Sequence, residues 1–147
     1  METGQKTRKV VYTDGIYDLF HRGHVESFIQ IKQMFPNCYL IVGIMDDKVA
    51  EGYKRKPIYS EEDRYWLVEN MKCVDEIVKS APLIMTEEYL NKYNIDLVVH
   101  GFSNPIDSLK QDDFFKIPIQ LGKFVETQYY SGISTTEILS RIKNDYF

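Results

Sequence analysis

Two histidines, His21 and His24, lie three positions apart near the start of the chain, with Gly23 between them. The apolar run 10–12 is typical of a short buried strand, and the residues from Val25 onward are typical of an amphipathic helix. The first turn of a helix carries unpaired backbone N–H groups and the positive end of the helix dipole, so it favours an anion. Imidazoles three positions apart in that turn face the same side and can donate hydrogen bonds to phosphate oxygens. The spacing therefore predicts a phosphate site suited to phosphoryl-transfer chemistry.

The neighbours of the histidine pair bear on what this loop does. Gly23 leaves room for a ligand to approach the backbone closely, and Asp14 and Asp18 lie in the loop before the histidines. Two other interpretations stay open on the histidines alone, namely metal ligands or ordinary surface residues. The strand, the two aspartates, the glycine and the helix together favour the phosphate site over both.

The composition places bounds on the class of protein. A length of 147 residues and a hydrophobic content of 44% predict one globular domain, 1–147, and the net charge of −4 argues against a nucleic-acid partner. Cys38 and Cys73 lie in or beside apolar segments and are expected to be reduced thiols. Residues 1–9 contain no apolar signal core, and no stretch approaches the roughly 20 apolar residues of a membrane span. We therefore expect a soluble, cytoplasmic protein without a membrane segment.

Strand and helix patterns alternate along the chain with short connections, which predicts a parallel sheet with helices on both faces. The expected strands are residues 10–12, 39–44, 75–78, 97–99 and 124–125. The expected fold is α/β, a Rossmann-like, doubly wound sheet of five parallel strands in the order 3-2-1-4-5. Asp46 and Asp47 follow the second strand at its carboxyl end, the edge where ligands bind in such sheets.

Capping residues and apolar periodicity predict four helices between these strands. The first follows the histidines and ends at Pro36-Asn37, with an apolar face of Phe28, Ile29, Ile31 and Phe35. Ser60 caps the second, whose buried side is expected to be Trp66, Leu67, Met71 and Val74. Thr86 caps the third, at about 87–93, and a capping box at 134–137 precedes the last, at 138–143. Residues 102–116 show little periodicity and are interpreted as a long irregular segment beside the site.

Five separate stretches of the sequence resemble a single protein family. They are Asp-Gly-Ile-Tyr-Asp at 14–18, His-Arg-Gly-His at 21–24, Arg-Tyr at 64–65, Val-Asp-Glu-Ile-Val at 74–78 and Gly-Ile-Ser-Thr-Thr at 132–136. The second of these looks like the signature of the nucleotidyltransferase superfamily, and by itself it leaves adenylyltransferases open. The last two point to one branch. From about Val10 to Ile142 the chain resembles the cytidylyltransferases that make CDP-choline, CDP-ethanolamine or CDP-glycerol.

The resemblance implies a reaction in which a phosphomonoester oxygen attacks the α-phosphorus of CTP and pyrophosphate leaves. No protein nucleophile is needed, so catalysis rests on positioning and on stabilising charge. By this resemblance His21 and His24 bind the triphosphate, and Lys54 is a mobile catalytic lysine that reaches the α-phosphate. The basic run Lys54 to Lys56, which alone indicates only a solvated face, then becomes a basic lid. Mg²⁺ is expected to be carried by the triphosphate, with no metal site in the protein.

The same resemblance assigns roles to further residues. Lys72 matches a basic position that meets the substrate phosphate, and Asp14 lies near the alcohol or amine end of the second substrate. Asp18 either orients an imidazole or caps its turn, and His100 either contacts the cytosine or is a satisfied polar group. The segment 134–136 binds the β- and γ-phosphates, caps the last helix, or does both. The nucleotide site expected in this way comprises Asp14, Gly15, Ile16, Asp18, Gly23, His100, Gly132, Ser134, Thr135 and Thr136.

Three positions depart from the family pattern. The family usually has Arg-Thr-Glu/Gln-Gly before the last helix, whereas this chain has Tyr-Tyr-Ser-Gly at 129–132, and tyrosine lacks the charge and the fork of a guanidinium. After His100 the family commonly carries aspartate, whereas this chain has Gly-Phe-Ser at 101–103. The phosphocholine enzymes have an aromatic residue at the position of Leu83, where a ring face suits a quaternary ammonium.

The expected function is CMP transfer from CTP to phosphoethanolamine or phosphocholine, in phospholipid biosynthesis. Two alternatives stay open: a catalytically impaired relative that binds nucleotide or assembles with partners, and a cytidylyltransferase for another phosphomonoester. By resemblance only, we also expect a homodimer, formed through the helix after the histidines and the helix that carries Arg64 and Tyr65.

Overall fold

A computed structural model describes residues 8–147 of the chain. The prediction that residues 1–9 hold no signal sequence falls mostly on residues 1–7, which lie outside the described part. Among residues 8–147, no helix is both long and apolar enough to cross a membrane. Cys38 and Cys73 are both free thiols, as the sequence predicts.

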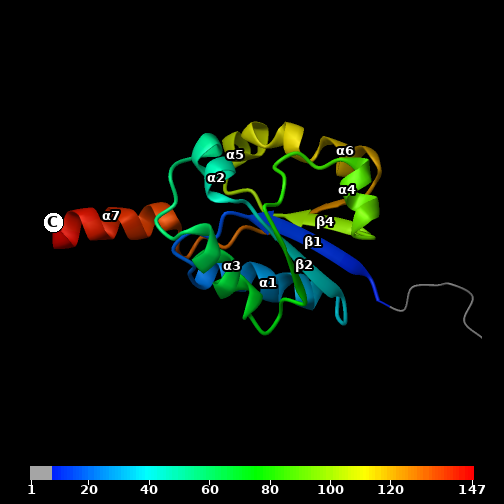
Figure 1. Cartoon of the computed structure of the whole chain (residues 1–147), viewed down its shortest axis with the longest axis horizontal. Coiled ribbons are helices and arrows are strands. Elements are labelled where there is room, and N and C mark those ends of the chain that lie inside the picture. Colours follow the sequence, from blue (N-terminus) through cyan, green and yellow to red (C-terminus); the bar gives the residue numbers. More distant parts are fainter. Residues whose placement is uncertain (1–7) are drawn as a thin grey trace, which may run out of the picture.

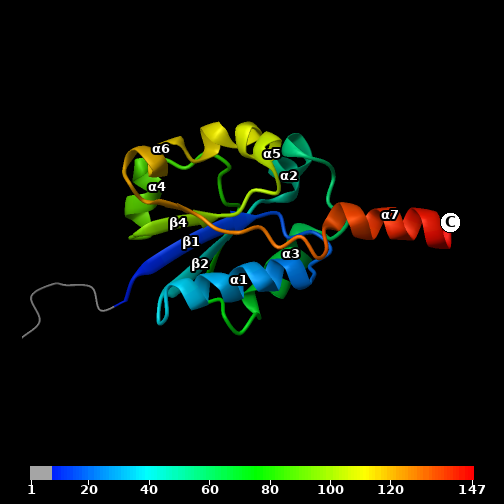
Figure 2. The ribbon, with the colours of Figure 1, turned by 180° about the vertical axis from the view of Figure 1, so that it is seen from behind.

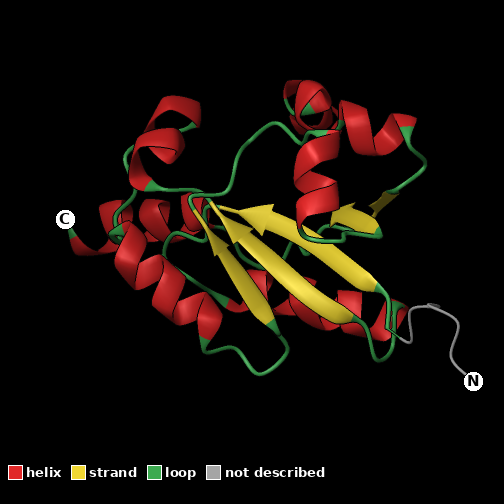
Figure 3. Cartoon of the chain, turned by 45° about the vertical axis from the view of Figure 1, so that its right-hand side comes forward, coloured by secondary structure: helices red, strands yellow, loops and turns green. Residues whose placement is uncertain are grey.

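Five strands form a single sheet in the order β3-β2-β1-β4-β5, and every neighbouring pair is parallel. Their bounds are β1 Val10–Gly15, β2 Tyr39–Ile44, β3 Glu76–Lys79, β4 Leu97–His100 and β5 Phe124–Glu126. The long strands point the same way in Figure 3, so their carboxyl ends meet at one edge of the sheet. The predicted fold class and strand order are therefore confirmed.

Helices cover both faces of the sheet (Figures 1 and 2). Their bounds are α1 Arg22–Met34, α2 Asp47–Tyr53, α3 Glu61–Glu69, α4 Glu87–Lys92, α5 Pro105–Lys110, the 3₁₀ helix η1 Asp112–Phe114, α6 Lys116–Gln120 and α7 Thr135–Tyr146. α1 and α3 lie on one face, and α4, α5 and α6 lie on the other. α7 extends away from the rest of the molecule in both views.

The alternation of side chains along each strand supplies both faces with a core. On β1, Val11 packs into the cluster that includes Phe28 of α1 and Val68 of α3. The next residue, Tyr12, packs into the opposite cluster, which includes Leu90 of α4. These residues are almost completely buried. Continuous apolar runs thus become central strands because both of their faces are covered.

The prediction of an irregular segment at 102–116 is wrong. Asn104 caps α5 by accepting a hydrogen bond from the Asp107 N–H, and Pro105 occupies the first helical turn. Ile106 and Leu109 are exposed, so the helix has no apolar stripe facing the core that periodicity could have revealed. The short helix α2 was not predicted either, although Asp46 caps it through the Val49 N–H.

The expected buried side of α3 is also wrong in part. Trp66 is 63% exposed, whereas Arg64, Tyr65 and Val68 form the buried face. An arginine is an unexpected core residue because burial of a charge is costly unless its hydrogen bonds are satisfied. The Arg64 guanidinium has such partners, and they come from distant segments.

Helix termini follow the capping signals closely. α1 ends at Met34 with Phe35 as C-cap, just before Pro36-Asn37, and Ile29 of its expected apolar face is 39% exposed. α7 begins at Thr135 and is longer than predicted, because Ser134 already caps it by accepting from the Glu137 N–H. The Glu137 side chain pairs with Arg141 on the next turn.

Candidate functional site

A cavity of about 880 Å³ lies at the carboxyl edge of the sheet. Its floor includes Asp14 at the end of β1 and His100 at the end of β4. The connections from these two adjacent strands lead to opposite faces, so this is the topological switch point where open α/β sheets bind ligands. The amino ends of α1 and α7 both line the cavity, and each adds the N–H groups of a helix start.

The predicted histidine pair lies at the start of α1 in a reciprocal cap. His21 is the N-cap, its Nδ1 accepts from the Gly23 N–H at 3.0 Å, and its own N–H donates to Nδ1 of His24 at 3.1 Å. The two rings stack with centroids 3.9 Å apart, so they face the same side as expected. Phe20 stacks on the other side of the His24 ring at 5.2 Å. Both Nδ1 atoms accept hydrogen bonds, so each neutral ring carries its proton on Nε2.

Burial keeps both rings uncharged near neutral pH. Desolvation, aided by the charges of His21 and Lys54, lowers the pKa of His24 to about 3. Desolvation also lowers the pKa of His21, which is less deeply buried. The pair therefore offers two Nε2–H donors to the cavity without a net charge of its own.

Close packing at the histidine turn requires glycine at position 23. A Cβ on Gly23 would lie 2.8 Å from Cε1 of His21 and 3.2 Å from the Ile133 carbonyl oxygen. The segment before α7 therefore lies directly against the start of α1. The hydroxyl of Thr135 adds a second link by donating to the Asp18 carbonyl oxygen at 2.9 Å. These contacts bring the N-termini of α1 and α7 to one cavity, although Gly23 and Thr136 are 113 positions apart in the sequence.

Most of the residues predicted for the site line this cavity. The lining includes Asp14, Gly15, Ile16, Asp18, His21, Gly23, His24, Lys54, His100, Ser134, Thr135 and Thr136. Gly132 lies just outside it, in a neighbouring 500 Å³ groove between α1 and the segment 128–132. A Cβ on Gly132 would lie 2.5 Å from the Tyr130 hydroxyl oxygen, so glycine lets this tyrosine fold back against the chain.

Lys54 is the C-cap of α2, and its backbone N–H donates to the Ala50 carbonyl oxygen at 2.9 Å. Its ammonium lies 5.5 Å from the centre of the Tyr53 ring, and that ring meets Phe114 of η1 edge-on at 5.2 Å. The positive charge of Lys54 also lowers the pKa of His24, so the ammonium lies close enough to the histidine pair to interact with it electrostatically. The cavity wall thus carries an exposed cation on a short anchored helix.

Asp14 is a buried carboxyl group without a hydrogen-bond partner for Oδ2. Desolvation raises its pKa to about 7. Nδ1 of His100 lies 3.9 Å from Oδ1, too far for a hydrogen bond, and burial lowers the pKa of His100 to about 4. A buried carboxyl oxygen without a hydrogen-bond partner is stabilised when a ligand supplies a hydrogen-bond donor or a cation.

For Asp18 the structure shows the capping role, one of its two expected alternatives, and Lys72 lies away from the cavity. The Asp18 carboxylate accepts from the N–H groups of Leu19, Ile58 and Tyr59, and no contact with an imidazole is found for it among the described residues. It therefore ties loops together and does not orient a histidine. Lys72 does not line the cavity: it is exposed in the turn before β3, at the amino edge of the sheet, because the chain must return there to begin a parallel strand.

Sequence reasoning missed part of the wall. Asp107 and Gln111 line the cavity from α5 and its C-cap, where the Gln111 amide donates to Asp107 at 2.8 Å. Hydrogen bonds from Ser103 and Gln111 and the charge of Lys54 lower the pKa of Asp107 despite the opposing effect of burial. The cap signal Asn104-Pro105 could have revealed this helix. The expected position of segment 102–116 beside the site is confirmed, since several of its residues line the cavity.

The departures from the family pattern also line the site. Tyr129 and Leu83 both contribute to the cavity wall, and the Arg22 guanidinium lies 5.7 Å from the centre of the Tyr130 ring. No guanidinium from the segment 128–132 enters the cavity, since that segment contains none.

No group of three or more His, Cys, Asp or Glu residues that could hold a metal ion is found within residues 8–147. The acidic side chains of the cavity are spread over different walls, and those of Asp18 and Asp107 already accept hydrogen bonds.

Comparisons with known proteins agree with this geometry. Residues 12–141 match the family model described as cytidylyltransferase-like. The chain is 43% identical over 136 residues to choline-phosphate cytidylyltransferase A of Rattus norvegicus, and 36% identical over 132 residues to ethanolamine-phosphate cytidylyltransferase of Mus musculus. These matches cover 92% and 90% of this chain but only 37% and 32% of the relatives, so the chain spans about a third of their length.

Solved structures support the fold. The crystal structure of a lipopolysaccharide core biosynthesis protein from Thermoplasma volcanium superposes with a TM-score of 0.66 at 21% identity, over 84% of this chain and 98% of that one. The family model spans nearly all of the described residues, including both helix N-termini at the cavity. The chain belongs to the cytidylyltransferase-like family.

Proposed function

We propose that this chain transfers CMP from CTP to a phosphorylated amino alcohol, phosphocholine or phosphoethanolamine, and releases pyrophosphate in phospholipid biosynthesis. The observation that carries the proposal is the convergence of two helix N-termini, a stacked pair of neutral histidines and Lys54 on one cavity at the switch point. This arrangement suits a polyanion whose charge shifts during reaction. The names of the relatives support the cytidyl group and the amino alcohol.

The histidines act by donating hydrogen bonds to the triphosphate. In the free protein each imidazole presents Nε2–H, because its Nδ1 is already an acceptor. When the oxygen of the second substrate attacks the α-phosphorus, the bond to pyrophosphate breaks and negative charge grows on the leaving phosphate oxygens. The two Nε2–H groups stabilise this charge by hydrogen bonding, and no proton has to be transferred to the rings.

The remaining groups position the two substrates. The N–H groups at the start of α7, together with Ser134 and Thr135, bind the β- and γ-phosphates, while Lys54 reaches the α-phosphate from α2. Mg²⁺ enters as a complex with the triphosphate and neutralises part of its charge. No side chain forms a covalent intermediate, so the rate gain comes from alignment and charge stabilisation.

Asp14 supplies the site for the positive end of the amino alcohol. Its buried, unpartnered oxygen gains a counter-charge when an ammonium group binds. The rings of His100 and Phe115 line the same cavity as Asp14, and their centroids lie 4.8 Å apart. Ring faces and a carboxylate suit a cation better than the uncharged glycerol of glycerol 3-phosphate.

We also propose that the chain forms a homodimer and works in the cytoplasm. Two large apolar residues, Trp66 and Ile58, are 63% and 58% exposed at and before α3. Burial of these side chains against a second copy removes apolar surface from water. Light scattering of the purified chain, compared with a Trp66→Glu variant, tests the dimer.

The test of the reaction is pyrophosphate release with CTP and Mg²⁺, with phosphocholine, phosphoethanolamine and glycerol 3-phosphate offered separately. His24→Asn is the matched control, since its side-chain oxygen replaces Nδ1 as the acceptor for the His21 N–H but lacks Nε2–H. Release with an amino alcohol only, lost in His24→Asn, is the expected result. Release with glycerol 3-phosphate alone would refute the assigned substrate class.

One observation favours a second candidate, a nucleotide-binding relative with impaired catalysis. Tyr129 stands in the cavity wall where the family usually has arginine, so one phosphate ligand is missing. Binding of CTP without pyrophosphate release from any acceptor would support this candidate over the transferase.

A further inference from the structure

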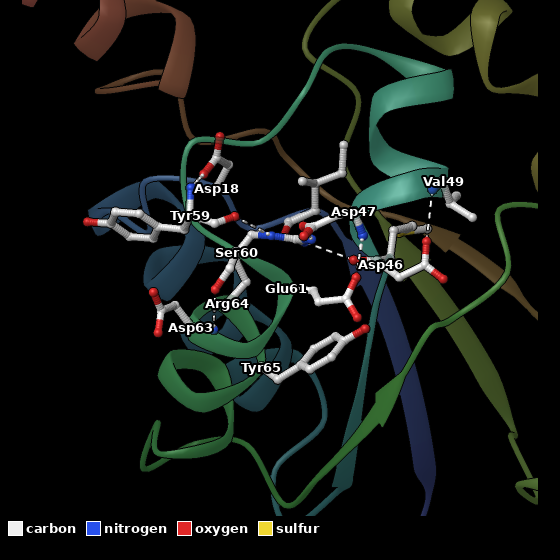
Figure 4. Close-up of polar contacts among 12 residues, drawn as sticks. Asp18, Asp46, Asp47, Val49, Tyr59, Ser60, Glu61, Asp63, Arg64 and Tyr65 are labelled. Atoms are coloured by element: carbon white, nitrogen blue, oxygen red, sulfur yellow. Dashed lines mark hydrogen bonds and ion pairs between the residues drawn. The ribbon is translucent and has the colours of Figure 1, made fainter.

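The Arg64 side chain is completely buried and bonds to four residues in three separate segments of the chain (Figure 4). Nη1 donates to the carbonyl oxygens of Ile16, in the loop after β1, and Met45, after β2, at 2.7 and 2.8 Å. Nη2 donates to the Asp47 carboxylate at 2.7 Å, and Nε donates to the Tyr59 carbonyl oxygen at 3.2 Å. A planar fork with fixed donor directions is what allows one side chain to meet these partners together.

Two of these contacts bracket the segment that carries Lys54. Asp47 is the first residue of α2, and Lys54 is its C-cap, so the ion pair with Arg64 fixes the amino end of this helix. Tyr59 lies five residues beyond Lys54 and is fixed at the other end by the Nε bond. Asp18 strengthens this second end, because its two oxygens accept from the Ile58 and Tyr59 N–H groups at 2.8 Å each.

The short stretch 54–57 between these anchors has far fewer attachments. Lys54, Arg55 and Lys56 are exposed, and apart from the Lys54 N–H in the helix cap, no hydrogen bond is found for them among the described residues. A loop held at both ends samples fewer conformations than a free one, so less entropy is lost when it orders on a ligand.

We infer that Arg64 is a positioning residue that, with Asp47 and Asp18, holds both ends of the 47–59 segment and so sets the reach of Lys54 into the cavity. Neither Arg64 nor Asp47 lines the cavity, so the effect on a ligand passes through Lys54. The inference rests on the proposed function for its catalytic consequence, whereas the anchoring itself is independent of any reaction.

The first experiment measures anchoring without catalysis. Trypsin cleaves after Lys54 and Arg55, while Pro57 protects the bond after Lys56, so mass spectrometry reports the opening of this segment. Asp47→Ala removes one anchor from a half-exposed residue and leaves the other three bonds of Arg64 in place. Arg64→Lys keeps the charge but cannot reach all four partners. Arg141→Lys, at an exposed ion pair on α7, is the matched control.

We expect cleavage at Lys54 and Arg55 to be at least about tenfold faster in Asp47→Ala and Arg64→Lys than in the wild type or Arg141→Lys, as for a segment that opens locally. Cleavage at sites outside residues 47–59 stays unchanged in Asp47→Ala. Equal cleavage at Lys54 in Asp47→Ala and the wild type would overturn the inference whether or not Arg64→Lys folds. This outcome is separate from failure of the proposed function, because it requires no CTP.

The second experiment asks whether the anchors act through Lys54. In pyrophosphate release, Asp47→Ala lowers kcat about tenfold in the wild-type background, since a small displacement of a catalytic group is costly. In a Lys54→Ala background the same change has little further effect, because the group it positions is gone. Fully additive losses in the two backgrounds would show a merely structural role and refute the inference.

Discussion

The buried carboxyl group of Asp14 makes the sharpest prediction about pH. Burial raises the pKa of Asp14 from 3.8 to about 7 in the folded chain. The folded chain therefore holds this proton more tightly than the unfolded chain between these two pH values. Stability from this proton is fully present below pH 4 and is lost as the pH rises through about 7.

The size of the effect follows from the two pKa values. The change from 3.8 to about 7 corresponds to roughly 4 kcal/mol, lost at about 1.4 kcal/mol per pH unit. His24 and His100 act in the opposite direction, because burial lowers the pKa of each, to about 3 and about 4. They are protonated on unfolding below about pH 6.5, so their contribution to stability rises with pH up to that value.

Asp14→Asn isolates the carboxyl group from these histidines. The side chain keeps its shape and cannot ionise, and the two histidines remain in both proteins, so their contributions cancel in the difference. Urea unfolding at pH 5, 6, 7 and 8 gives the free energy of unfolding of each protein. We expect the free energy of unfolding of the variant, relative to that of the wild type, to rise steadily from pH 5 to 7 and to stay constant above pH 7.

A free-energy difference that is constant from pH 5 to 8 would refute the reasoning, since it would mean that Asp14 is already ionised in the folded chain. Saturating phosphocholine offers an internal check. A bound cation stabilises the carboxylate and lowers the pKa of Asp14, so binding at pH 6 should release a proton, measured by calorimetry in buffers of different ionisation enthalpy.

Three further predictions concern packing, capping and phosphate binding. Val68→Ala should lower the free energy of unfolding by about 2 kcal/mol, because Val68 is buried. Trp66→Ala at low protein concentration should change it by less than about 0.5 kcal/mol, because Trp66 is exposed. Equal losses for the two variants in urea unfolding would contradict the assigned buried face of α3. Ser134→Ala should lower the free energy of unfolding by about 1 kcal/mol, because the Glu137 N–H loses its hydrogen-bond acceptor. Ser134→Asp supplies another acceptor and should keep the free energy of unfolding close to that of the wild type in the same assay. Tyr129→Arg should lower the KM for CTP, because a guanidinium adds a phosphate ligand to the cavity wall, and an unchanged KM would show that this position does not meet the triphosphate.

Local sequence determined the histidine site to a large extent. The stacking of His21 on His24 and their caps involve atoms within three residues of one another, so the spacing alone specifies the geometry. Capping signals likewise placed the starts of α3 and α4. The apolar runs and their alternation with helices were enough to predict a parallel sheet with helices on both faces.

The tertiary structure decided the roles of the charged residues. Arg64 bonds to partners 5, 17, 19 and 48 positions away, and the Asp18 carboxylate bonds to Ile58 and Tyr59, 40 and 41 positions away. No periodicity within a helix or strand encodes such distances. Arginine on a short helix is normally a surface residue, and only the assembled carbonyl groups around it make its burial favourable.

The same reason explains Lys72 and Asp14. Whether a lysine near a strand lies at the carboxyl or the amino edge depends on where the chain crosses the sheet, and Lys72 lies at the amino edge. Whether the Asp14 carboxyl group at the end of β1 is exposed to water or buried depends on the helices formed by residues 105–120 and on α7. Sequence therefore determined which groups are available for chemistry, whereas desolvation and long-range hydrogen bonds, set by the packed fold, decided which of them face a ligand.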